Sequence, residues 1–155
     1  MLPYFDYSIV IYKMDSLKSH AHCVYNLHIH IVFVTKYRKK VITSAMLERM
    51  SEIFTKLCET QKCKLTEFNG EADHVHLLID LAPDIAISKL VNILKTISSR
   101  EIRKEFKEHL AKFYWKPVFW TSAYCAISAG GAPLSILKQY IQSQDSPESE
   151  DPNRS

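Results

Sequence analysis

Residues 24–36 read VYNLHIHIVFVTK, and most of this run is β-branched or aromatic. Such residues favour extended backbone, and apolar positions that alternate with polar ones indicate a strand with one buried face. A second stretch, His74–Leu81 (HVHLLIDL), has the same character. We predict that these two stretches form the strongest strands of the chain.

The segments around these two strands alternate between helix and strand signals. Ser and Thr favour helix N-caps, Pro favours first turns, and apolar residues at helical spacing mark buried helix faces. The further predicted elements are a helix over 44–61 capped by Thr43 or Ser44, a short strand over 65–69, a turn over 70–73, a long helix over 83–106, a strand over 120–128 and a final helix over 133–144.

The predicted order of strands and helices is β-α-β-β-α-β-α. It is typical of the split βαβ arrangement of ferredoxin-like folds, which belong to the α+β class. We expect one antiparallel sheet with helices on one face. The other face is then available for a ligand or for the C-terminal helix.

Length and composition predict one globular domain of ordinary type. The chain has 155 residues, a net charge of +3 and a pI near 8.6, which is compatible with a polyanionic partner. We assign 20–145 to the domain, 1–19 to an N-terminal extension with Met14 as a candidate start, and 146–155 to a disordered tail. The four cysteines form no C-x-x-C pair and no apolar stretch reaches membrane-spanning length, so we expect a cytoplasmic protein without a membrane partner.

The segment Asp73-His74-Val75-His76 carries the first candidate chemistry. Residues two apart on a strand project from the same face, so His74 and His76 point together while Val75 faces the core. Two imidazoles on one face can begin a divalent metal site. An isolated pair of this kind is more often two surface histidines on a solvated strand.

The final predicted helix carries the second candidate chemistry. Tyr140 and Gln144 are four residues apart, so they neighbour each other on one helix face. A tyrosine hydroxyl beside an amide oxygen can place a nucleophile next to a metal ligand. The alternative is that Tyr140 packs at the edge of the apolar stripe and Gln144 is a solvated helix end.

Positive charge mixed with aromatic residues is the third signal. Cationic side chains contact phosphates and aromatic rings stack on bases. The candidate DNA-binding residues are Lys36, Tyr37, Arg38, Lys39 and Lys40 after the first strand, and Arg100, Arg103 and Lys104 near the end of the long helix. For the helix the alternative is a solvated charged face, because acidic residues are interleaved with the basic ones.

Taken together, these segments resemble one family. Residues 24–41, the run 73–78, Ser98-Ser99-Arg100, the run 130–134 and the run 138–144 look like motifs of the single-tyrosine transposases of the smallest insertion sequences. These are the TnpA-type and REP-associated tyrosine transposases, members of the His-hydrophobic-His (HUH) nuclease superfamily. The resemblance covers about residues 20 to 145.

The resemblance implies a reaction and a site. His74, His76 and Gln144 would bind Mg²⁺ or Mn²⁺, and Tyr140 would attack a DNA phosphate to form a 5′-phosphotyrosine with a free 3′-OH. The substrate would be single-stranded DNA with subterminal hairpins. The chain would act as a homodimer whose subunits share active sites, with Gly130-Gly131 as the joint before the catalytic helix. The family usually has glycine in place of Thr96 and often a basic residue in place of Ile97.

Three alternatives compete with this interpretation. The first is a non-enzymatic regulator that binds DNA or RNA hairpins. The second is a two-histidine RNA phosphodiesterase, which is disfavoured because Leu78 stands where such enzymes need a hydroxyl residue two positions after His76. The third is a zinc site at His20, His22 and Cys23, for which the sequence offers no partner cluster.

Overall fold

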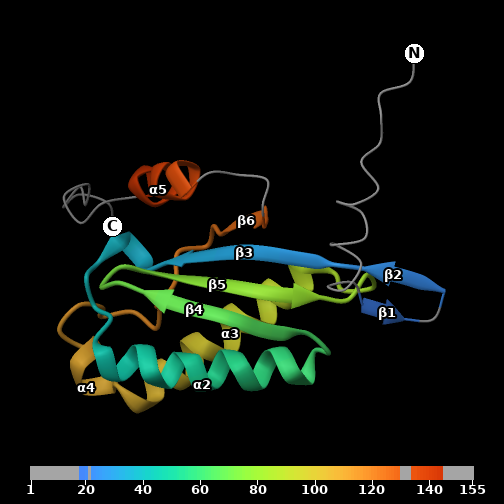
Figure 1. Cartoon of the computed structure of the whole chain (residues 1–155). Coiled ribbons are helices and arrows are strands. Elements are labelled where there is room, and N and C mark those ends of the chain that lie inside the picture. The colour runs from blue at the N-terminus through green and yellow to red at the C-terminus, as the bar shows by residue number, and fades with distance from the viewer. Residues whose placement is uncertain (1–17, 21, 130–133, 145–155) are drawn as a thin grey trace.

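A four-stranded antiparallel sheet forms the centre of the computed structural model, which describes residues 18–20, 22–129 and 134–144. The strands lie in the order β4-β5-β3-β6 (Figure 1). Their bounds are Leu27–Val34 for β3, Lys64–Gly70 for β4, His74–Leu81 for β5 and Cys125–Ser128 for β6. This order, with the first and third strands of the βαββαβ unit at the centre, confirms the predicted ferredoxin-like α+β class.

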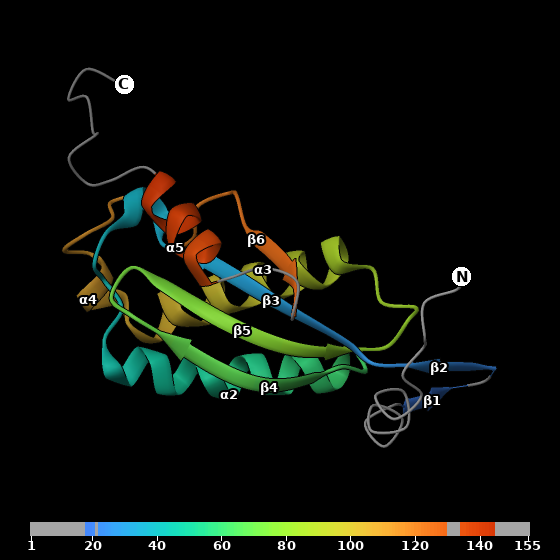
Figure 2. The ribbon, with the colours of Figure 1, turned by 45° about the horizontal axis from the view of Figure 1, so that its top comes forward.

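Helices lie on both faces of the sheet, as two turned views show (Figure 1 and Figure 2). On one face lie α2 (Ser44–Thr60) and α3 (Ile87–Glu105), and α4 (Lys107–Leu110) follows α3. On the other face lies α5 (Leu134–Ser143). We call these the helix-covered face and the open face. The prediction placed two helices on one face and left the other face for a ligand or the C-terminal helix. The structure places the C-terminal helix, α5, on that other face.

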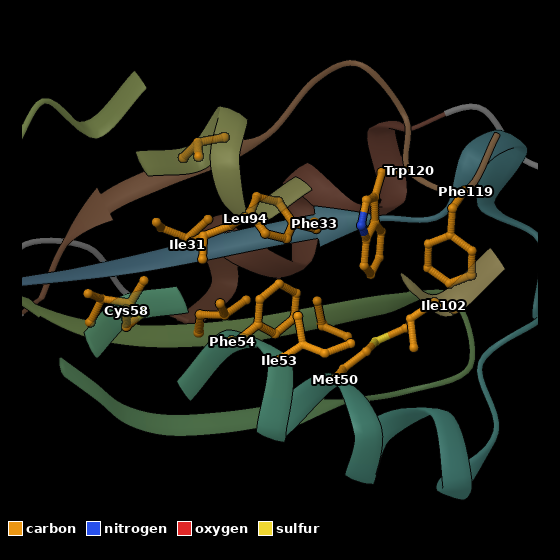
Figure 3. Packing of buried hydrophobic residues seen from close by; sticks show 14 of the residues in the cluster. Ile31, Phe33, Met50, Ile53, Phe54, Cys58, Leu94, Ile102, Phe119 and Trp120 are labelled. Carbon is orange, nitrogen blue, oxygen red and sulfur yellow. The ribbon is translucent and has the colours of Figure 1, made fainter. Parts of the chain in front are cut away.

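The main core fills the space between the sheet and α2 and α3. Phe33 is fully buried there, with its ring centroid 6.0 Å from that of Phe54 and 5.6 Å from that of Trp120 (Figure 3). The indole nitrogen of Trp120 donates to Ser98 Oγ at 2.9 Å, which satisfies the polar atom that its burial removes from water. Burial of large apolar side chains is the main source of stability in such a layer.

The two long helices begin differently from each other. At the start of α2, the Thr43 hydroxyl accepts a hydrogen bond from Met46 N at 3.3 Å, which confirms the predicted cap. The start of α3 was predicted at Pro83, but the helix begins at Ile87. The intervening residues form a turn in which Ile85 N donates to Ala82 O at 3.2 Å, so the chain is not yet helical there.

The sequence predicted one continuous strand over 24–36, and this prediction was wrong, because the structure has two strands there. The break falls at Asn26, between β2 (Cys23–Tyr25) and β3. The first part pairs with β1 (Lys18–His20) in a separate antiparallel hairpin that the sequence did not predict. The Lys18 ammonium of this hairpin forms an ion pair with Asp80 of β5.

The predicted strand over 120–128 is regular only over β6. The preceding carbonyls of Thr121, Ser122 and Ala123 accept hydrogen bonds from the Lys95 ammonium at 2.6, 2.9 and 3.3 Å. These carbonyls therefore converge on one side chain of α3 instead of forming a strand ladder. Trp120 makes one isolated bridge, to Thr35.

The terminal predictions fall largely outside the described residues, which exclude 1–17 and 145–155. The predicted boundary between extension and domain, at residue 20, falls within β1. In the described part of the chain, every helix is too short or too polar to span a membrane.

Candidate functional site

His74 and His76 project from β5 onto the open face, as the two-residue spacing predicts. They lie opposite Val34 and Val32 of β3 in the antiparallel register. Their ring centroids are 4.9 Å apart at an interplanar angle of 82°. His74 is 8% exposed and His76 is half-buried, so the pair does not lie on a fully solvated strand.

Asp73 fixes the orientation of His74. Its Oδ1 lies 2.7 Å from His74 Nδ1, and its Oδ2 lies 3.6 Å from Arg38 Nε. The Asp73 backbone is held in turn, because its carbonyl accepts from Thr35 N at 2.9 Å and from Thr35 Oγ1 at 3.1 Å. A carboxylate that accepts from one imidazole nitrogen leaves the other nitrogen for a metal ion. Sequence reasoning did not assign this role to Asp73; the signal was an acid directly before the first histidine.

The surroundings of His76 keep its imidazole neutral. Burial lowers its pKa below the ordinary value of 6.5, and the neighbouring His74 and His30 lower it further, while Glu71 opposes them. Neutral imidazole is the form that binds metal ions. A separation of 4.9 Å between the two rings is short enough for both to reach one ion. The two histidines therefore fit a divalent metal site with further positions open to other ligands.

Tyr140 packs on the open face through a small apolar cluster. Tyr140, its neighbour Ile141 and Cys125 of β6 all pack against Val32 and Val34 of β3. The hydroxyl is buried, and within the described residues it has no hydrogen-bond partner. Burial, and secondarily Cys125, raises the pKa of Tyr140 to about 12. In this conformation the phenol keeps its proton at neutral pH.

Gln144 contacts the backbone of the same helix. Its Nε2 lies 3.4 Å from the Tyr140 carbonyl oxygen and 3.4 Å from Ser143 Oγ. The structure therefore brings Gln144 beside Tyr140, as the helical spacing predicts. Across the described ranges, no three His, Cys, Asp or Glu side chains are grouped to hold a metal ion. The predicted joint at Gly130-Gly131 lies outside the described residues.

The first group of predicted DNA-binding residues lies beside the histidine pair. Lys36, Tyr37 and Arg38 form a short helix, η1, directly after β3. Tyr37 and Arg38 have φ angles of 59° and 51°, a left-handed conformation that costs on the order of 1–3 kcal/mol for a residue with a side chain. Arg38 Nη1 donates to Gln142 O of α5 at 3.4 Å, so η1 connects the C-terminal helix with Asp73.

The next two residues of this group also lie at the surface. The Lys39 ammonium lies 5.8 Å from the centroid of the Tyr37 ring and 5.6 Å from that of Tyr114, and Lys40 is exposed. This arrangement places lysine charge and aromatic rings side by side, as a nucleic-acid surface requires.

The second group of predicted DNA-binding residues lies on α3, on the helix-covered face. Arg103 Nε donates to Ser99 Oγ at 3.2 Å, Arg100 Nε is 3.7 Å from Glu101 Oε1, and Lys104 is exposed. Arg103 lines a cavity of about 420 Å³ between α3 and the 117–124 segment. The structure does not bring this group together with His74 and His76, because the sheet separates them.

Comparison with known proteins gives consistent matches along most of the chain. The model of the family "Transposase IS200 like" matches residues 23–144. The transposase of insertion sequence IS200 from Salmonella typhimurium is 31% identical over 131 residues, which cover 84% of this chain and 85% of the relative. The ISDra2 transposase TnpA from Deinococcus radiodurans is 26% identical over 135 residues, covering 87% and 95%.

A solved structure supports the same assignment. A crystal structure of a candidate transposase from Deinococcus radiodurans R1 superposes with a TM-score of 0.77 at 27% identity, covering 83% of this chain and 98% of that one. The expected family is thereby confirmed. The chain belongs to the family of IS200-like transposases, whose members move DNA elements.

Proposed function

We propose that this transposase cleaves and rejoins single-stranded DNA at insertion-sequence ends, with Tyr140 as the nucleophile. The observation that carries the proposal is that α5 packs on the sheet face from which His74 and His76 project. The family assignment supports insertion-sequence DNA as the substrate.

In the proposed reaction, the Tyr140 oxygen attacks the phosphorus of the scissile phosphodiester. A tyrosine O–P bond forms, the tyrosine proton is released, and the bond to the 3′ oxygen breaks and leaves a protonated 3′-OH. The product is a 5′-phosphotyrosine. Attack by another 3′-OH reverses the step and restores the tyrosine, so no ATP is needed to rejoin the DNA.

His74 and His76 would hold Mg²⁺ or Mn²⁺, with Gln144 as the third protein ligand. The bound ion would polarise the phosphate and stabilise charge on the leaving oxygen. Asp73 acts as a positioning residue, because it accepts a hydrogen bond from His74 Nδ1 and so sets the direction of the other ring nitrogen.

The buried Tyr140 hydroxyl must leave its apolar pocket before it can attack. Burial raises its pKa to about 12, which opposes its ionisation while it packs against Val32 and Val34. We therefore propose that α5 shifts when DNA binds. A homodimer in which α5 of one subunit completes the site of its partner is one arrangement that satisfies this requirement.

The two groups of basic residues lie in different places: residues 36–40 lie beside the histidine pair, and the α3 group lies on the helix-covered face. We propose that residues 36–40 contact the strand that is cut, because Arg38 is joined to Asp73 and to α5. Arg100, Arg103 and Lys104 of α3 would contact the phosphates of the subterminal hairpin.

A covalent adduct tests the role of Tyr140. Wild-type protein, mixed with Mn²⁺ and a single-stranded oligonucleotide that carries an element end and its hairpin, should give a protein–DNA band on a denaturing gel. Tyr140→Phe should abolish this band because the attacking oxygen is gone. The melting temperature should not fall, since the hydroxyl has no partner in the described part of the chain. The matched control is Tyr124→Phe, at an exposed tyrosine. An adduct in Tyr140→Phe would disprove the assignment.

A second candidate is a non-enzymatic regulator that binds DNA or RNA hairpins. The buried, protonated hydroxyl of Tyr140 favours it, because this hydroxyl is not activated in the described conformation. Hairpin binding without metal-dependent cleavage of any element end would support this candidate over the transposase mechanism.

A further inference from the structure

Trp115 is the most exposed large apolar side chain of the described residues. It is 88% exposed, whereas Trp120, five positions later, is 8% exposed. An indole normally buries much of its large apolar area, so exposure on this scale marks a contact surface when ligand-binding groups surround it. The groups around Trp115 therefore indicate what it contacts.

The loop that carries Trp115 is held firmly against η1. Tyr114 donates its hydroxyl proton to Lys36 O at 2.7 Å, and the Lys39 ammonium donates to Phe113 O at 2.9 Å. Lys36 N donates to Phe119 O at 2.7 Å. These bonds tie the loop on both sides of Trp115 to η1. A loop whose backbone is already fixed loses little conformational entropy when a ligand binds.

The charge around Trp115 is positive. The Lys116 ammonium lies 4.6 Å from the centroid of the Trp115 ring. The Lys39 ammonium lies over the half-buried ring of Tyr37 and the buried ring of Tyr114. The cavity between Trp115, Lys116, Lys39 and Tyr37 measures only about 30 Å³. It is too small to admit a nucleobase, so a base would have to stack on the outer surface of the indole.

We propose that Trp115, flanked by Lys116 and Lys39, is a stacking platform for an unpaired base of single-stranded DNA. An indole stacks on any base, and the two ammonium groups can contact the adjoining phosphates. The platform deepens the proposed function and rests on it, because it assumes that single-stranded DNA is the substrate.

The position of the platform relates it to the histidine pair. It adjoins η1, which follows β3 at the end where Val34 pairs with His74. Within η1, Arg38 is joined to Asp73, which holds His74. A DNA strand that stacks on Trp115 and runs along η1 therefore reaches the proposed catalytic site. The platform would thus set how many nucleotides separate the stacked base from the phosphate that is cut.

Oligothymidylate of about 12 nucleotides is a suitable probe, because it forms no hairpin and stacks on aromatic side chains. Binding is measured in the Tyr140→Phe background, where no cleavage occurs. Tryptophan emission of this protein should be quenched on titration, because Trp115 is exposed and Trp120 is not. Trp115→Ala should remove the quenching and weaken binding about 10-fold or more, while Trp115→Phe should retain part of the affinity.

Charge and position are tested with two further variants. Lys116→Gln should reduce the slope of log affinity against log salt by about 0.7, the value for one phosphate contact of a single strand. The control is Tyr124→Ala, at an aromatic residue that is 38% exposed and lines the α3 cavity with Arg103. Its affinity for oligothymidylate should equal that of the parent, because this probe has no hairpin for the α3 group to contact. Melting temperatures of all variants should match the parent, because the changed side chains lie at the surface.

Unchanged oligothymidylate affinity in Trp115→Ala, or an equal loss in Tyr124→Ala, would overturn the platform. If Trp115→Ala instead turned a dimer into a monomer at unchanged affinity, the residue would belong to an interface between copies, and the platform would be wrong. The Tyr140 adduct is measured separately. If wild-type protein forms the adduct but Trp115→Ala binds oligothymidylate as tightly as the parent, the platform alone is rejected. If Trp115→Ala weakens binding but wild-type protein forms no adduct, the catalytic role of Tyr140 alone is rejected.

Discussion

The two faces of the sheet are built from the same strands but differ in the polarity of the side chains that they bury. On the helix-covered face, β3 and β5 contribute apolar side chains such as Ile31, Phe33 and Leu77, all fully buried. On the open face lie all three buried side-chain atoms that have no hydrogen-bond partner among the described residues, His28 Nδ1, Asp80 Oδ1 and Tyr140 OH. Such atoms cost free energy. The difference shows that one face supplies the large apolar core while the other carries buried polar groups, among them those of the candidate site.

The largest effect is expected from a pair of neighbouring leucines on β5. Leu77 is fully buried on the helix-covered face, and Leu78 is half-buried on the open face. Leu77→Ala should lower the free energy of unfolding by about 2–5 kcal/mol, because it leaves a cavity in a close-packed core. Leu78→Ala should cost clearly less. Urea denaturation measures both, and equal losses would show that the two faces are packed alike.

An intermediate effect is expected at Asp73, which holds His74 through Nδ1. Asp73→Asn keeps the shape of the side chain but removes its charge. It should weaken Mn²⁺ binding about 10- to 100-fold, the usual consequence of losing an outer-shell carboxylate. Isothermal titration calorimetry measures the affinity, with Glu52→Gln as a control that loses an exposed ion pair with Arg49. Unaltered Mn²⁺ affinity in Asp73→Asn would exclude the positioning role.

The smallest effect is a pH dependence of stability that originates on the open face. The pKa of His76 is lowered in the folded chain, so the unfolded chain binds a proton more readily. The free energy of unfolding should therefore fall as the pH drops below the ordinary value of 6.5, and level off once the pH passes below the folded pKa. Melting temperatures between about pH 7 and about pH 5 measure the change. His76→Gln should flatten the curve, and an equally steep curve would assign the effect to other groups.

Local signals were sufficient to predict the sheet and the histidine pair. Alternation in β3 and β5 fixed which residues share a face, and the Thr43 cap fixed the start of α2. The facing of His74 and His76 follows from their two-residue spacing alone, because a strand has no other way to orient them.

One error, the predicted strand over 120–128, arose where a distant side chain determines the local structure. The segment before β6 has strand-forming residues, but the Lys95 ammonium of α3 binds three of its carbonyls. The packing of Tyr140 of α5 against Val32 of β3 is likewise a contact between segments far apart in the sequence. Residue spacing along one segment contains no information on such contacts.

The alternation of β3 and β5 also bears on how this protein can evolve. Each substitution in these strands falls on one face only, so the chemistry of the open face can change while the core stays as it is. A deletion of one residue from β3 after Ile31, with the end of the strand kept in register, would bury His28 and His30 and expose Ile29 and Ile31. Divergence is therefore confined to substitutions in the strands, while gain and loss of residues is confined to the loops.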